Sequence, residues 1–121
     1  MLKVFLIEDA PRIRTVLIET LQAIDNVEVV GFAETEQDAL TQLRMLEWDV
    51  VIVDIALRAG NGLIVLASLQ TDGRRYGVRL VFTNHPSLAL KNRSLALGAD
   101  AFFDKSHEMD ALISRVQEMA A

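Results

Sequence analysis

Cysteine is absent from the 121-residue sequence, and this absence excludes both a disulfide framework and a thiolate metal site. It also suits a reducing compartment. No apolar stretch approaches the length needed to span a bilayer, so we expect no membrane association. The apolar part of the N-terminus, Met1 to Ile7, is too short for the core of a signal peptide, and two acidic residues follow it. We therefore expect a soluble protein of the cytoplasm.

Positive charge is also scarce, with 12 Lys and Arg residues against 17 Asp and Glu residues and a formal net charge of −5. A protein that binds nucleic acid through its phosphates presents a basic face or stripe. The only adjacent basic pair is Arg74-Arg75, which a solvated loop explains. We therefore expect no direct contact with nucleic acid.

Apolar residues, in contrast, make up 51% of the chain, and they fall into short runs that alternate with longer amphipathic stretches. The short runs are typical of buried strands and the longer stretches of helices. Strands are predicted at 4–7, 27–32, 50–53, 78–82 and 101–103, each followed by a helix. Strict alternation indicates a parallel sheet that is covered by helices on both faces. The sequence therefore predicts one doubly wound α/β domain over residues 1–121.

Proline, glycine and a hydroxyl residue mark helix ends. Pro11 suits the first turn of the first helix. Thr35 opens the second helix, with Asp38 three residues later in an approximate capping box. We expect the fourth helix to start at Pro86 and to be closed by Gly98 in the usual C-terminal position.

Polar residues follow four of the predicted strands, at the edge where ligands bind in open parallel sheets. They are Glu8, Asp9, Asp54, Thr83 and Lys105. Three carboxylates at one edge repel one another, and one of them has a raised pKa unless a cation neutralises the group. Mg²⁺ prefers a few carboxylates together with waters and a phosphate oxygen. We therefore expect a Mg²⁺ site, to which the backbone carbonyl of Ala56 adds an oxygen and Lys105 a positive charge.

This set of groups can support phosphoryl transfer. A carboxylate is already ionised, so it can act as a nucleophile and form an aspartyl phosphate without a strong general base. The oxygens of the transferred group need cations and hydrogen-bond donors. Mg²⁺, Lys105, the Thr83 hydroxyl and loop amides can supply them.

Taken singly, these residues also have plain structural explanations. Lys105 alone fits a surface lysine, and Thr83 alone fits a cap at a strand end. Phe102 fits a simple core aromatic, and Phe103 should pack more deeply because adjacent strand residues face opposite ways. Packing or loop positions account for three further side chains: Trp48, Tyr76 and His85.

Several segments, in their order and spacing, resemble the receiver domain of bacterial two-component response regulators over essentially the whole chain. They are the acidic pair Glu8-Asp9, the segment 54–62 (Asp-Ile-Ala-Leu-Arg-Ala-Gly-Asn-Gly), the segment 81–83 and the segment 98–105. The resemblance implies a flavodoxin-like fold with a five-stranded parallel sheet of order 2-1-3-4-5 and five helices.

The resemblance also implies a role for each site residue. Asp54 is the phosphoacceptor, and Glu8 and Asp9 hold the metal with it. Thr83 and Lys105 bind the phosphoryl oxygens. Phe102 falls at the position of the aromatic switch residue.

The implied function is phosphorelay signalling. A histidine kinase, a phosphotransfer protein or a small phosphodonor phosphorylates Asp54, and the surface of the fourth helix, fifth strand and fifth helix is remodelled for a downstream partner. The domain catalyses only its own phosphorylation and dephosphorylation. We expect a stand-alone regulator, or the isolated receiver of a longer one, with weak dimerisation through the remodelled surface.

The sequence departs from the family pattern at several positions. Arg58 and Ser106 stand where proline is frequent, and Asn84 stands where a small residue is usual. Arg58 and Asn84 keep an alternative open, namely a receiver-like module that binds proteins without being phosphorylated. A flavodoxin-like cofactor binder is disfavoured, because two acids rather than a glycine-rich phosphate loop follow the first strand.

Overall fold

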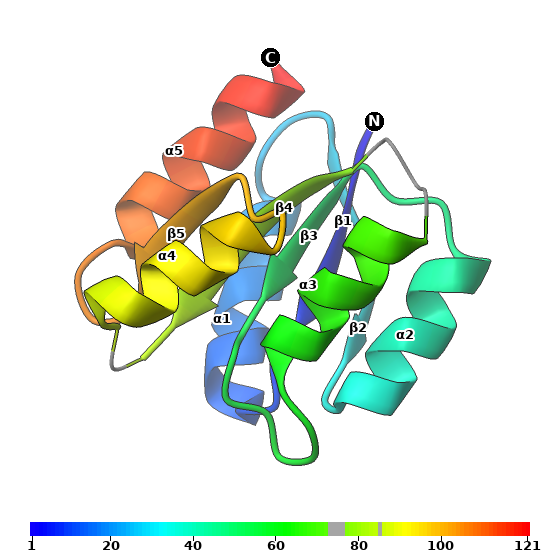
Figure 1. Cartoon of the computed structure of the whole chain (residues 1–121). Helices are drawn as coiled ribbons and strands as arrows, with labels where there is room; N and C mark the ends of the chain where they lie inside the picture. The colour runs from blue at the N-terminus through cyan, green and yellow to red at the C-terminus, as the bar shows by residue number, and fades with distance from the viewer. Residues whose placement is uncertain (73–76, 85) are drawn as a thin grey trace.

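The computed structural model describes residues 1–72, 77–84 and 86–121, and strands and helices alternate along them (Figure 1). The expectations for Arg74, Arg75, Tyr76 and His85 fall outside these ranges. The strands are β1 (Leu2–Ile7), β2 (Val27–Ala33), β3 (Val50–Val53), β4 (Val78–Thr83) and β5 (Ala101–Asp104). The helices are α1 (Pro11–Gln22), α2 (Glu36–Met45), α3 (Gly62–Thr71), α4 (Leu88–Ala96) and α5 (Met109–Ala120).

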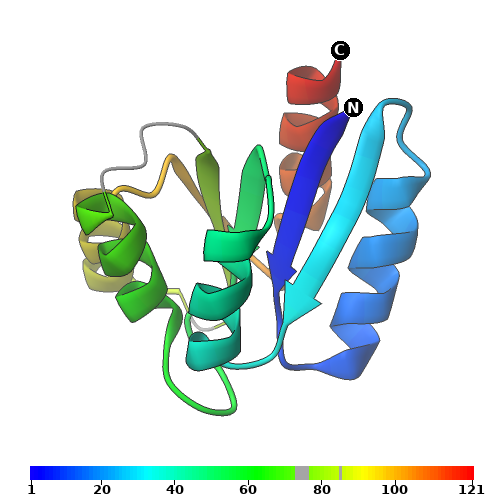
Figure 2. The same ribbon diagram turned by 90° about the vertical axis from the view of Figure 1, so that its right-hand side faces the viewer.

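The sheet is parallel throughout, and its strand order is β2-β1-β3-β4-β5. This order confirms the predicted doubly wound, flavodoxin-like fold. Helices α2, α3 and α4 cover one face of the sheet, and α1 and α5 cover the other (Figures 1 and 2). The bounds of β3 match the predicted ones, and the other four strands extend by one or two residues beyond their predicted bounds.

Continuous apolar strands are explained by the two covered faces, because successive side chains of a strand point to opposite sides. On β1, Phe5 and Ile7 pack in the layer under α2, α3 and α4. The alternate residues Val4 and Leu6 pack in the layer under α1 and α5. All four residues are fully buried, so neither face of β1 needs polar side chains.

Most of the predicted helix ends are confirmed. Pro11 lies in the first turn of α1. The Thr35 hydroxyl oxygen accepts the Asp38 N–H at 3.2 Å and caps α2. Gly98 follows the C-cap of α4 with a φ of +100°, a conformation that glycine adopts without strain.

The predicted start of α4 at Pro86 is wrong. The helix begins at Leu88, and Ser87 is its N-cap. The Ser87 hydroxyl oxygen accepts the Leu90 N–H at 3.1 Å, which satisfies an amide that lacks a partner inside the helix. Pro86 therefore precedes the cap.

The aromatic side chains bear out two packing predictions. Trp48 is buried, and its indole N–H donates to the Leu43 carbonyl oxygen at 3.2 Å. Phe103 is 8% exposed and lies in the α1/α5 layer, whereas its neighbour Phe102 is only partly buried and packs against the opposite layer.

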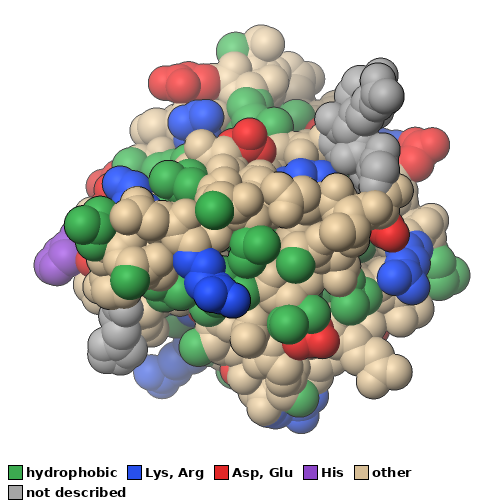
Figure 3. Space-filling model, in the orientation of Figure 1, with side chains coloured by type: hydrophobic (Ala, Val, Ile, Leu, Met, Phe, Trp, Pro, Cys, Tyr) green, Lys and Arg blue, Asp and Glu red, His purple; other side chains and the backbone are tan. Residues whose placement is uncertain are grey.

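Both termini lie at the amino end of the sheet, opposite the edge at which the strands end (Figures 1 and 2). On the face drawn in Figure 3, the basic side chains are dispersed among hydrophobic and acidic ones. None of the helices in the described ranges combines the length and the apolar character that crossing a bilayer requires.

Candidate functional site

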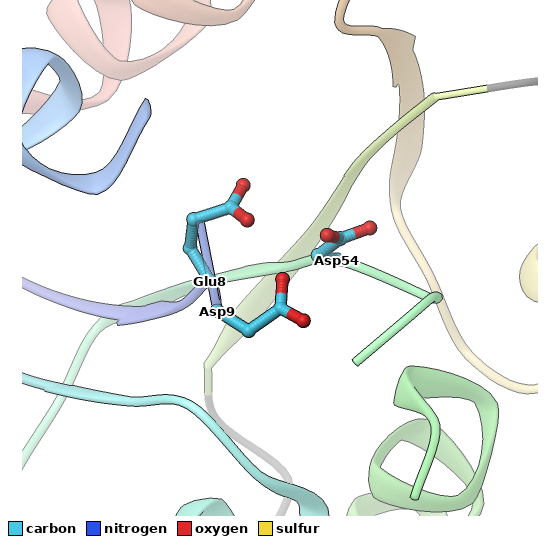
Figure 4. Close-up of side chains that lie close together, drawn as sticks. All are labelled: Glu8, Asp9 and Asp54. Atoms are coloured by element: carbon cyan, nitrogen blue, oxygen red, sulfur yellow. The ribbon is translucent and has the colours of Figure 1, made fainter. Parts of the chain in front are cut away.

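Three carboxylates meet at the carboxyl edge of the sheet. Glu8 and Asp9 follow β1, and Asp54 follows the neighbouring strand β3 (Figure 4). Each residue offers a carboxylate oxygen that lies within 4.8 Å of the oxygens offered by the other two. Backbone hydrogen bonds fix the two strand ends, since the Asp54 N–H donates to the Ile7 carbonyl and the Glu8 N–H to the Ala33 carbonyl, both at 3.0 Å. The structure thus brings the three acids selected from the sequence into one cluster.

Lys105 neutralises part of this charge. It follows β5, and its Nζ lies 2.5 Å from Glu8 Oε1 and 2.8 Å from Asp54 Oδ2. The side chains of Lys105, Glu8 and Asp54 are 6%, 1% and 5% exposed, so all three charges are largely removed from water. Because a buried charge without a partner is costly, the shared ammonium holds the two acids in place.

Burial and ion pairing shift the pKa values of two groups in the cluster, Glu8 and Lys105. Burial raises the pKa of the Glu8 carboxyl above its ordinary 4.5, the hydrogen bond from Lys105 opposes this, and the negative charge of Asp54 raises the pKa further. Burial acts to lower the pKa of Lys105, but its hydrogen bonds to Asp54 and Glu8 outweigh that effect, so the pKa lies above 10.5. Lys105 therefore remains a cation at neutral pH.

Both oxygens of Asp54 accept hydrogen bonds. The buried Thr83 hydroxyl, at the end of β4, donates to Oδ1 at 3.0 Å, and the Ala56 N–H donates to the same oxygen at 3.3 Å. Lys105 donates to Oδ2. Asp54 is thus a buried, ionisable oxygen nucleophile that is surrounded by donors able to hold further oxygens in its vicinity.

The donor set also fits a hard divalent cation. Carboxylate oxygens are the ligands that Mg²⁺ prefers, and three acids against one ammonium leave the cluster net negative. Asp9 is only half-buried, so one side of the cluster is open to water and to an incoming ligand.

An ion network beside the cluster was not singled out from the sequence. Arg14 Nη1, from α1, donates to the Glu8 carbonyl oxygen at 3.1 Å and lies 3.0 Å from Glu34 Oε1. Glu34 also pairs with Arg58, 3.6 Å from its Oε2 to Nη2. A signal was present, because Glu34 is the residue directly after β2, and collecting the polar residue after that strand as well would have included it.

Comparisons with known proteins agree with the fold. The family model for the response regulator receiver domain matches residues 4–117. A protein-glutamate methylesterase/protein-glutamine glutaminase of Clostridium acetobutylicum is 29% identical over 96% of this chain and 36% of its own length. A nitrate/nitrite response regulator protein homolog of Haemophilus influenzae is 27% identical over 98% of this chain and 57% of its own length. The crystal structure of the response regulator domain of Thermotoga maritima CheB superposes with a TM-score of 0.86 at 21% identity, covering 99% of this chain and 93% of that one.

The chain spans roughly a third to somewhat more than half of the curated relatives named above. The family match, in contrast, covers nearly all of the chain, and the structural match shows the same fold. The chain therefore belongs to the receiver domains of response regulators, the phosphorelay signalling domains of two-component systems.

Proposed function

We propose that residues 1–121 form one receiver domain that works as a phosphorylation-driven switch, with Asp54 as the phosphoacceptor. The arrangement around Asp54 carries this proposal. A buried carboxylate lies beside two further carboxylates and has an ammonium on one oxygen and a hydroxyl on the other. Such a domain catalyses its own phosphorylation and dephosphorylation and turns over no metabolite.

In the proposed reaction, an oxygen of Asp54 attacks the phosphorus of a phosphohistidine or of a small phosphodonor such as acetyl phosphate. A new O–P bond forms as the P–N or P–O bond of the donor breaks. The donor leaves as an imidazole, which takes up a proton, or as acetate. The Lys105 ammonium and the Thr83 hydroxyl, 2.8 and 3.0 Å from Asp54, then bind oxygens of the attached group.

The proposed Mg²⁺ ligands are Glu8, Asp9, Asp54 and the backbone carbonyl of Ala56. The support is the chemistry of the donors, which are hard oxygens in a cluster of net negative charge. When bound, Mg²⁺ neutralises charge on the phosphoryl oxygens. Glu8 would hold the metal in place of its ion pair with Lys105, and the ammonium would then be available to the phosphoryl group.

The proposed output is a change of surface. Thr83 exchanges Asp54 Oδ1 for a phosphoryl oxygen, and Phe102, on the neighbouring strand β5, turns inward. Phosphorylation shifts the population between two states that differ on the surface of α4, β5 and α5. The proposed partners are a histidine kinase or phosphotransfer protein, a downstream protein and, weakly, a second copy of the chain, all in the cytoplasm.

Intact-mass spectrometry after incubation with acetyl phosphate and Mg²⁺ tests the proposal. We expect the wild type to gain one phosphoryl group and the Asp54→Ala variant to gain none. Omission of Mg²⁺ should greatly reduce the gain in the wild type. A folded wild type that gains nothing with Mg²⁺ present would favour the alternative, a receiver-like module that binds proteins without phosphorylation.

A further inference from the structure

The loop that carries Asp54 and Ala56 forms hydrogen bonds with a second segment outside the acidic cluster, the connection from β2 into α2. Residues 54–61 connect β3 to α3, residues 34–35 connect β2 to α2, and Glu36 is the first residue of α2. The two connections run side by side at the carboxyl edge, where Thr35 and Ala59 form a parallel bridge. The position of the β3–α3 loop therefore depends on its neighbour as well as on its own strand.

Glu36, at the start of α2, makes two of the contacts to the β3–α3 loop. Its backbone N–H donates to the Ala59 carbonyl at 3.0 Å, and its side-chain Oε1 accepts the Asn61 N–H at 3.1 Å. The backbone of Gly60 packs closely against the Glu36 side chain, since a Cβ at Gly60 would lie 2.4 Å from Glu36 Cβ. Gly60 also has a φ of +83°, which a glycine adopts without strain. The loop backbone is thus both hydrogen-bonded to Glu36 and packed against its side chain.

Arg58 makes a third contact, to Glu34 in the connection between β2 and α2. Its Nη2 lies 3.6 Å from Glu34 Oε2, and Arg14 holds Glu34 from the opposite side at 3.0 Å. Arg14 in turn donates to the Glu8 carbonyl. The chain of contacts therefore links the strand end that carries Glu8 with the loop that carries Ala56.

These contacts reach Ala56 by a short route. Ala56 pairs with Asn61 in an antiparallel bridge, so the end of the loop that Glu36 holds lies directly opposite the proposed carbonyl ligand. A loop with few contacts of its own samples many positions unless its neighbours fix it. Residues that contact the ligands of a metal, without binding the metal themselves, affect metal affinity by orienting those ligands.

We propose that Glu36 and Arg58 are positioning residues for the metal site: they hold the β3–α3 loop so that Asp54 and the Ala56 carbonyl face the metal, and their loss weakens Mg²⁺ binding although no ligand is removed. This inference rests on the Mg²⁺ site of the proposed function. It concerns side chains that do not belong to the cluster of Glu8, Asp9 and Asp54.

Isothermal titration calorimetry with Mg²⁺ alone tests the role of Glu36. We expect Glu36→Ala to raise the dissociation constant about three- to tenfold, below the effect of a fully buried partner. Glu36→Gln should bind nearly as the wild type does, because its amide oxygen can accept the same Asn61 N–H. A change that came only from the lost negative charge would weaken both variants equally.

The Arg58→Ala variant distinguishes a positioning role from a charge effect, because the two change Mg²⁺ affinity in opposite directions. Removal of a positive charge near the site tightens Mg²⁺ binding if charge alone matters, whereas loss of a loop contact weakens it. We expect a weakening of about threefold, because Arg58 is largely exposed. The matched control is Arg44→Ala, which removes an equally exposed arginine (64% against 67%) from its 3.9 Å pair with Asp72, at the far ends of α2 and α3. This control should leave Mg²⁺ binding unchanged.

The possible outcomes are distinct. Wild-type affinity in both Glu36→Ala and Arg58→Ala would overturn the inference and leave the proposed function intact. Equal weakening of Glu36→Gln and Glu36→Ala, or tighter binding by Arg58→Ala, would also overturn it, in favour of charge alone. A folded wild type that does not bind Mg²⁺ would overturn the metal site of the proposed function and the inference with it.

Discussion

Lys105 is the residue on which the charge balance of the acidic cluster depends. Its ammonium contacts both Glu8 and Asp54, and each of the three side chains is at most 6% exposed. Lys105→Met keeps most of the aliphatic stem but leaves two buried carboxylates without their cation. We expect a loss of about 3 kcal/mol in the free energy of unfolding in metal-free buffer. Urea denaturation measures it, and Mg²⁺ should recover part of the loss; a variant as stable as the wild type would contradict the pairing.

Asp54 is predicted to lower the stability of the metal-free protein through repulsion from Glu8 and Asp9. Asp54→Asn keeps an oxygen that can accept the Thr83 hydroxyl and removes one negative charge. We expect its melting temperature in metal-free buffer to rise by about 3–5 °C, which corresponds to about 1 kcal/mol for a domain of this size. The matched control is Asp25→Asn at an exposed position, which should not change the melting temperature. A clear drop for Asp54→Asn would mean that the ion pair with Lys105 outweighs the repulsion.

Glu8 should make the stability depend on pH in metal-free buffer. Its pKa is raised from 4.5 by burial, so the folded state favours the neutral carboxyl. The stabilisation from this shift is present below pH 4.5 and is lost as the pH rises through the raised pKa. We therefore expect the stability of the wild type relative to Glu8→Gln to fall as the pH is raised from 4.5 towards neutrality. Thermal melts of both proteins along a pH series measure this difference, and a constant difference would contradict the raised pKa.

At the scale of single residues, the sequence predicted the strand-end residues of the site, because their place beyond apolar runs depends only on chain order. It also predicted that Lys105 adds a positive charge to the acids, but not which carboxylate oxygens the ammonium contacts. Lys105 and Glu8 are far apart in the chain, and their ion pair follows from side-chain directions at the edge of the folded sheet. The contact between Glu34 and Arg58 likewise depends on the course of two loops, which apolar periodicity does not describe.

At the scale of elements, the junction between the β3–α3 loop and helix α3 is tightly packed. Gly62 is the first residue of α3, and a Cβ there would lie 2.2 Å from the Asp54 carbonyl oxygen and 2.7 Å from Val53 Cγ1. Gly62→Ala must therefore displace the backbone of Asp54 or the start of α3. We expect a loss of about 2–3 kcal/mol in stability, measured by urea denaturation, together with slower phosphorylation by acetyl phosphate. Unchanged stability would mean that α3 can shift without cost.

Other features of the elements explain which boundaries were predictable. The apolar runs located all five strands, because both faces of the sheet are covered and need no polar side chains. Helix starts were less certain where two signals compete. Pro86 and Ser87 can each begin a helix, and the serine does so because its hydroxyl accepts an amide hydrogen bond, which proline cannot do. The Asn61 cap of α3, which accepts the Ile64 N–H at 3.1 Å, was also missed, since Asn61 lies in a glycine-rich loop.

At the scale of the whole molecule, helix α4 presents apolar side chains to solvent. Leu88 is 74% exposed and Leu95 is 40% exposed, on the surface through which we propose weak dimerisation. We expect sedimentation velocity to show self-association that increases with protein concentration, and Leu88→Asp to reduce it. Met45→Asp on α2 is the matched control, because Met45 is 79% exposed and lies outside this surface. Equal effects of the two changes would exclude a specific α4 contact.

Both chain ends lie at the amino end of the sheet, and the carboxylates lie at the opposite edge (Figures 1 and 2). The molecule can therefore be tethered by either end to a sensor chip, a bead or a fluorescent protein while its acidic edge faces away from the support. An optical or single-molecule assay of phosphorylation can use such an attachment without screening the edge from a kinase. The same orientation allows a row of these domains on a surface to present every site to the solution.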